Sequence, residues 1–127
     1  MIQVELTDEM LNGEPGPNFY WRGLPEDFLS LVNALHELGR RHGVHVSVSD
    51  LDFVEMVDGH RITAVAAAGG TSLVKVQDRE VTIELDARIW QQGLAILLSV
   101  SYGPSSNYVE FDNCELREDA NFLINSR

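Results

Sequence analysis

The chain has 127 residues, of which 44% are hydrophobic and 23% are charged, and its formal charge is −11. This size and composition predict one globular domain spanning residues 1–127, with enough apolar residues to build a core. No stretch approaches the roughly 20 consecutive apolar residues that a membrane helix needs. The first residues lack the basic and apolar regions of a secretory signal, so we expect a cytoplasmic protein.

Acidic residues outnumber basic residues by 20 to nine. An acidic surface repels phosphate backbones and anionic lipids, and Arg40, Arg41 and His42 form the only adjacent basic run, so neither nucleic acid nor membrane is an expected partner. Eight of the nine basic residues are arginine, which is typical of a GC-rich bacterial genome or of a salt-adapted protein. The acidity therefore has three explanations: solubility, adaptation to salt, or an acidic face complementary to a basic protein.

The N-terminal part of the chain predicts two strands. Residues 2–6 alternate between apolar and polar side chains, which is the pattern of a half-buried strand. A loop rich in glycine and proline follows at residues 13–17, and residues 19–21 form a short aromatic strand.

The first helix is expected to begin at Pro25, because proline suits the first helical position. The preceding residue, Leu24, offers no side-chain oxygen as a cap. Either Gly39 or Gly43 is suited to end the helix. The apolar face of this helix is formed by Phe28, Leu31, Val32, Leu35 and Leu38.

The middle of the chain predicts a series of strands. Five segments alternate or are rich in β-branched residues: 44–48, 53–57, 61–67, 73–76 and 81–85. Asp58 and Gly59 suit a two-residue hairpin, and residues 77–80 suit a second turn. We therefore expect a continuous antiparallel meander, with closing strands at 108–111 and 120–124.

A second helix is expected from its cap at Asp86 to about Ser101, before the stop at Gly103 and Pro104. Its apolar residues cover roughly 200° of the circumference, which is wider than one sheet face buries. They are Ile89, Trp90, Leu94, Ile96, Leu97, Leu98 and Val100. Either the helix lies centrally between the sheet and the first helix, or its surplus apolar surface forms a homodimer contact through residues 86–101.

Together these elements predict an α+β fold, with a mainly antiparallel sheet of six to eight strands and two helices packed on one face. No catalytic motif accompanies them. His42 and His45 have no third ligand at a recognised metal spacing, and Asp50 with Asp52 begins a calcium loop whose later positions do not match. Cys114 lies among acids that oppose thiolate formation. We expect no metal, no cofactor and no catalytic residue.

Acidic residues concentrate in two segments. The first contains Asp50, Asp52, Glu55 and Asp58. The second contains Glu110, Asp112, Glu115, Glu118 and Asp119. A charged edge that blocks aggregation and a landing surface for a basic partner both explain such a segment. We predict partner binding by the second segment, together with Tyr20 and Trp21, whose residue types are enriched at interface hot spots.

The leading hypothesis is a non-enzymatic, acidic protein-binding domain, such as an inhibitor or immunity-type protein that covers a basic toxin or nuclease. Its basis is the charge of −11 on a small chain without a catalytic motif. One alternative is a small enzyme or ligand-binding protein whose pocket lies between the helices and the sheet. The other alternative is a homo-oligomeric structural protein.

Overall fold

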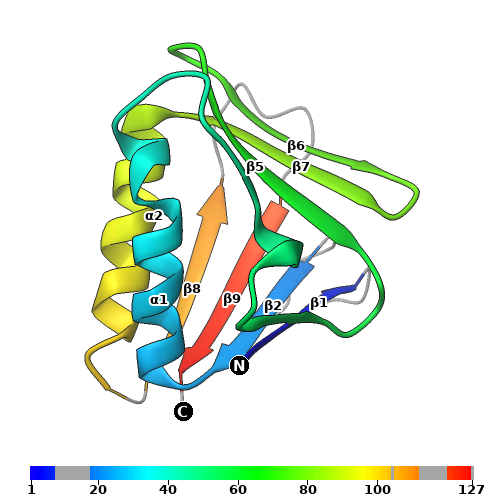
Figure 1. Ribbon diagram of the computed structural model, residues 1–127, viewed down its shortest axis with the longest axis vertical. Helices are drawn as coiled ribbons and strands as arrows, with labels where there is room; N and C mark the ends of the chain where they lie inside the picture. Colours follow the sequence, from blue (N-terminus) through cyan, green and yellow to red (C-terminus); the bar gives the residue numbers. More distant parts are fainter. Residues whose placement is uncertain (8–17, 104, 112–119, 127) are drawn as a thin grey trace.

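The computed structural model describes residues 1–7, 18–103, 105–111 and 120–126. These residues form an α+β fold with two α-helices and two mixed β-sheets (Figure 1). The five-stranded sheet has the order β4 (Val54–Met56), β1 (Ile2–Thr7), β2 (Asn18–Gly23), β9 (Ala120–Ser126) and β8 (Ser105–Phe111). The four-stranded sheet has the order β3 (His45–Ser47), β5 (Arg61–Ala67), β7 (Glu80–Asp86) and β6 (Ser72–Gln77). The helices are α1 (Pro25–Leu35) and α2 (Ala87–Val100), and two short 3-10 helices are η1 (His36–Gly39) and η2 (Val48–Asp50).

The strands occur close to where the alternating pattern predicts them, but the prediction of one antiparallel meander in a single sheet is wrong. Strand β4 leaves the path of the meander and pairs in parallel with β1, placing Ile2 beside Val54 and Val4 beside Met56. Strand β5 pairs in parallel with β7, while β6 lies outside β7 at the edge. A period-two pattern specifies which face of a strand is buried but leaves its neighbour undetermined, since every buried strand offers the same apolar face.

The turn at Asp58 and Gly59 joins two sheets instead of two neighbouring strands. Gly59 has a φ of 77°, as expected for this turn. However, one carboxylate oxygen of Asp58 accepts a hydrogen bond from the Leu6 backbone N–H at 2.8 Å, and Val57 N–H donates to the carbonyl of Val4 at 3.0 Å. These bonds hold the end of β4 on β1, so β5 enters the other sheet.

Helix α1 begins at Pro25, as predicted, and its final turn tightens into η1, which ends at Gly39. Leu24 supplies no side-chain cap, and the carboxylate of Asp27 instead accepts a hydrogen bond from the Leu24 N–H at 3.4 Å. Helix α2 begins at Ala87, and Asp86 caps it as predicted, since its carboxylate accepts a hydrogen bond from the Ile89 N–H at 2.9 Å.

The wide apolar arc of α2 follows from its position. This helix packs beside α1 and η1, and it also contacts strands of both sheets (Figure 1). The indole N–H of Trp90 donates to the carbonyl of Val65 at 2.9 Å, which ties α2 to β5. Trp90, Leu94 and Val100 are buried, whereas Ala95 is exposed and Leu98 is half-buried. Contacts within the chain thus cover most of the arc and leave one strip at the surface.

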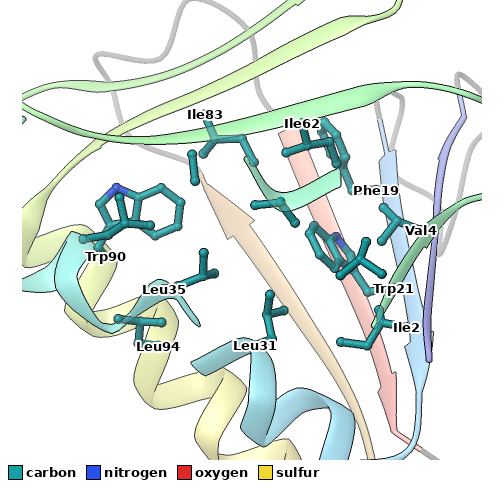
Figure 2. Close-up of a cluster of buried hydrophobic side chains, with 14 of the residues drawn as sticks. Ile2, Val4, Phe19, Trp21, Leu31, Leu35, Ile62, Ile83, Trp90 and Leu94 are labelled. Carbon is teal, nitrogen blue, oxygen red and sulfur yellow. The ribbon is translucent and has the colours of Figure 1, made fainter. Parts of the chain in front are cut away.

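Residues from both sheets and both helices meet in one hydrophobic cluster (Figure 2). Helix α1 contributes Leu31 and Leu35, while the β1 and β2 side contributes Val4, Phe19 and Trp21. The cluster fills the space between the helix pair and the two sheets. Strand β4 packs against one side of this cluster, and the helix pair packs against another side.

Candidate partner-binding surfaces

The structure places the predicted partner-binding residues in different parts of the chain. Asp112, Glu115, Glu118 and Asp119 lie outside the described residues. Glu110 belongs to β8, the edge strand of the five-stranded sheet, where its backbone pairs with Asn121. The second acidic segment is therefore described only at its first residue.

The two predicted aromatic residues lie on opposite faces of β2. Trp21 is only 6% exposed and is part of the hydrophobic cluster (Figure 2). Tyr20 is half-buried on the opposite face, and the guanidinium of Arg22 lies 5.2 Å from the centre of its ring. Successive residues of a strand alternate between faces, so the pair does not form one surface.

The first acidic segment lies at a sheet edge. Asp50, Asp52 and Glu55 are exposed along η2, the following turn and β4, and we name these three residues the β4 acidic edge. Strand β4 is the last strand on its side of the sheet. Within the described part of the chain, no Lys, Arg or His side chain forms an ion pair with any of the three. Their negative charge is therefore locally uncompensated.

An apolar side chain accompanies this acidic edge. Val57 follows β4, lies two residues after Glu55 and is 49% exposed. One carboxylate of this edge is also oriented, because the Ser47 hydroxyl donates to Asp50 at 2.8 Å. Val57 was missing from the residues predicted from sequence, because a single valine in a strand pattern carries no sign that it lies at the surface.

Asp58, the fourth acid of this segment, has a different environment. Burial alone would raise its pKa, but hydrogen bonds from the N–H of Leu6 and from the side chain and N–H of His60 outweigh burial and hold the pKa below its ordinary value. Nδ1 of His60 lies 2.8 Å from Oδ1 of Asp58. Arg79 donates to the Asp58 carbonyl at 2.7 Å, which further secures this turn.

A carboxylate beside the Nδ1 of a histidine is also part of a catalytic triad, in which the histidine activates a hydroxyl or thiol nucleophile. Among the described residues, no hydroxyl or thiol forms a hydrogen bond with the His60 imidazole. The hydrogen bonds of the Asp58 carboxylate all come from backbone N–H groups and from this neighbouring ring. The geometry is therefore that of a turn fastened to β1, and it does not assemble a nucleophilic site.

A groove of about 350 Å³ runs between the two helices. It is lined by Val32, His36, Gly39, Arg40, Gln91, Leu94, Ala95 and Leu98. The side-chain amide of Gln91 donates to the Gly39 carbonyl at 2.6 Å, and a Cβ on Gly39 would lie 3.0 Å from the Gln91 side chain. Glycine at this position thus permits the close approach of η1 to α2. The groove lies between helices, and not between the helices and a sheet as the pocket hypothesis expects.

Neither surface contains an assembled metal site. In the part of the chain that the structure describes, no three His, Cys, Asp or Glu side chains are grouped to hold an ion. No helix there combines the length and the apolar character needed to cross a membrane. Comparison of the chain with protein-family models, curated proteins and solved structures finds no match.

Proposed function

We propose that this chain is a non-enzymatic protein-binding domain whose β4 acidic edge captures a basic protein, in the manner of an inhibitor or immunity-type protein. One observation carries the proposal: three exposed carboxylates without ionic partners in the described structure precede an exposed apolar side chain, Val57, along the segment that forms an open sheet edge.

The electrostatics favour this class of partner. A cluster of like charges raises the local potential and accelerates the approach of an oppositely charged protein, with an effect that weakens as salt increases. Protein interfaces place apolar area at their centre and polar groups at their rim. The acidic edge supplies long-range attraction, while Val57 supplies a contact that loses water on binding.

The rigidity of the surface also supports the proposal. Asp50 is held by Ser47, and the turn after Val57 is held on β1 by Asp58. A surface that is ordered before binding loses less entropy when the complex forms. By charge, the segment from Glu110 to Asp119 remains a second candidate contact for a basic partner, separate from the β4 acidic edge, because Glu110 lies on β8 at the opposite edge of the sheet.

A salt-dependent binding experiment tests the proposal. The immobilised chain is exposed to lysate of the source cells, and the captured basic protein is identified, purified and titrated at 50 and 300 mM NaCl. The combined variant Asp50→Asn, Asp52→Asn, Glu55→Gln should weaken the association at least tenfold at low salt. A Val57→Ala variant should weaken it at both salt concentrations, because the apolar contact is not screened.

The matched control neutralises three acids elsewhere, with Asp78→Asn, Glu80→Gln and Glu84→Gln on the hairpin of β6 and β7. Its net charge equals that of the test variant. The ion pair of Glu80 is exposed and that of Glu84 is half-buried, and ion pairs near the surface contribute little to stability. If both variants lose the same affinity for the partner, the overall charge of the chain, and not the β4 acidic edge, explains the loss. If the affinity changes neither in the β4 variant nor with the salt concentration, the proposed surface is wrong.

A further inference from the structure

The outer face of the helix pair differs in charge from the rest of the molecule. Residues 25–41 and 87–100 contain three acids and three arginines: Glu26, Asp27, Glu37, Arg40, Arg41 and Arg88. This part of the chain is formally neutral, so the rest of the sequence carries the whole charge of −11. Two copies of the chain that meet through this face therefore bring no net like charge into contact.

The same face is apolar along its centre. Val32, Ala95 and Leu98 line the groove between the helices. Leu29, one helical turn before Val32, is 44% exposed, and Tyr102, just after α2, is 83% exposed. Contacts within the chain therefore leave an apolar seam on a face whose elements carry no net charge.

The charges are sorted along this face. Glu26 is exposed at the start of α1, whereas Arg40 lies just after η1, where Glu37 forms exposed ion pairs with Arg40 at 4.0 Å and with Arg41 at 3.0 Å and leaves this end with a net positive charge. The exposed Arg88 lies at the start of α2, which packs against η1, so it belongs to the same end of the helix pair as Arg40. Fourteen residues separate Glu26 from Arg40, which corresponds to roughly 21 Å along a helix. One end of the face is thus acidic and the other is basic.

We propose that a second copy of this chain covers the groove, forming a twofold homodimer through the helix-pair face. A twofold axis perpendicular to the helices and level with residue 33, midway between Glu26 and Arg40 and close to the Val32 end of the groove, reverses the direction of the partner helices. Glu26 of each copy then lies level with Arg40 of the other, and the apolar seams face each other. A basic partner protein would be repelled by the three arginines of this face, and an acidic partner protein would be repelled by Glu26.

The size of the face sets the strength of the contact. Two packed helices about 20 Å long and about 20 Å wide offer on the order of 400 Å² per copy, below the roughly 800 Å² per partner of a standard stable interface. The dimer should therefore be reversible, with a Kd in the micromolar range. Strand β4 is at the far edge of its sheet from β8 and β9, which α2 contacts, so both acidic edges stay accessible in the dimer.

Sedimentation equilibrium of the full chain from 5 μM to 1 mM in 150 mM NaCl tests the proposal. The average mass should rise from 14.2 kDa towards twice that value. Ala95→Glu places a charge at an exposed position in the seam and should hold the mass at 14.2 kDa throughout. Val57→Glu, the same kind of change at an exposed apolar residue on the β4 edge, should dimerise like the unaltered chain. A constant monomer mass for the unaltered chain, or a dimer that persists in Ala95→Glu, would overturn the proposal.

A charge exchange tests the twofold geometry separately. Glu26→Arg and Arg40→Glu should each weaken dimerisation at least tenfold, because each places like charges opposite one another. The double variant should return the Kd to within threefold of the unaltered value. If the double variant is as weak as the single variants, the antiparallel arrangement is wrong. Circular dichroism of each variant confirms that the fold is retained, since both positions are exposed.

Discussion

Replacing Asp86 by alanine removes the carboxylate that starts α2. One of its oxygens accepts the Ile89 N–H at 2.9 Å, and the other accepts the Gly70 N–H at 3.0 Å. The side chain therefore caps the helix and also fixes the turn between β5 and β6. Alanine leaves both N–H groups without this acceptor.

The expected loss is about 2 kcal/mol in the free energy of unfolding. Removal of an N-cap costs about 1 kcal/mol, and loss of the second hydrogen bond costs about another 1 kcal/mol. For a chain of this size, about 2 kcal/mol corresponds to a decrease of roughly 7 °C in Tm. Asp86→Asn keeps one acceptor oxygen without the charge, so its loss should be about half as large.

The loss should also depend on pH. Hydrogen bonds from Ile89 and then Gly70 lower the pKa of Asp86 below its ordinary value of 3.8. A carboxylate with a lowered pKa in the folded state stabilises the protein above the unfolded-state pKa, and this contribution disappears as the pH falls through the folded-state pKa. The difference between the unaltered chain and Asp86→Ala should therefore be full at pH 7 and should shrink between pH 5 and pH 3.

Urea denaturation followed by circular dichroism at pH 7, 5, 4 and 3 measures this difference. Asp52→Ala is the matched control, because it removes an exposed acid that makes no hydrogen bond within the described structure, and its effect should stay within about 0.5 kcal/mol. An effect of Asp86→Ala no larger than that of the control, or one that is constant from pH 7 to pH 3, would refute the reasoning.

Three further substitutions test individual contacts. Asp58→Asn should lower the free energy of unfolding by about 1–2 kcal/mol at pH 7. This loss should fade as the pH falls through 3.8 and below, because the lowered pKa of Asp58 stabilises the fold only while the carboxylate is charged. A loss that does not change in urea titrations from pH 7 to pH 3 would contradict this prediction. Trp90→Phe should lower the free energy of unfolding, measured by urea denaturation, by about 2–3 kcal/mol. It removes the hydrogen bond to Val65 and leaves a cavity at a position where the side chain is only 7% exposed. A loss below about 0.5 kcal/mol would show that this contact contributes little. Ser72→Ala should raise Tm, because the Ser72 hydroxyl is buried without a hydrogen-bond partner in the described structure. A lower Tm in a thermal melt would mean that this hydroxyl forms a stabilising hydrogen bond.

Local patterns in the sequence were sufficient to predict most of the elements. Proline at Pro25 and the apolar spacing that follows it located α1, and the carboxylate of Asp86 located the start of α2. Alternation of apolar and polar residues located the strands. These signals act within a few residues of one another, because a cap, a helical face and a pleated strand each depend on near neighbours along the chain.

The surfaces depended on contacts between distant parts of the chain. The path of β4 was decided when Asp58 bound the backbone of Leu6, and this placed Val57 and the β4 acidic edge at the rim of a sheet. Arg40 and Arg88 are 48 positions apart in the sequence, and the packing of α2 against η1 brings them to one end of the helix pair. A pattern along the chain determines which side of an element is buried. Which elements pack together depends on how all the apolar faces of the chain are buried at once.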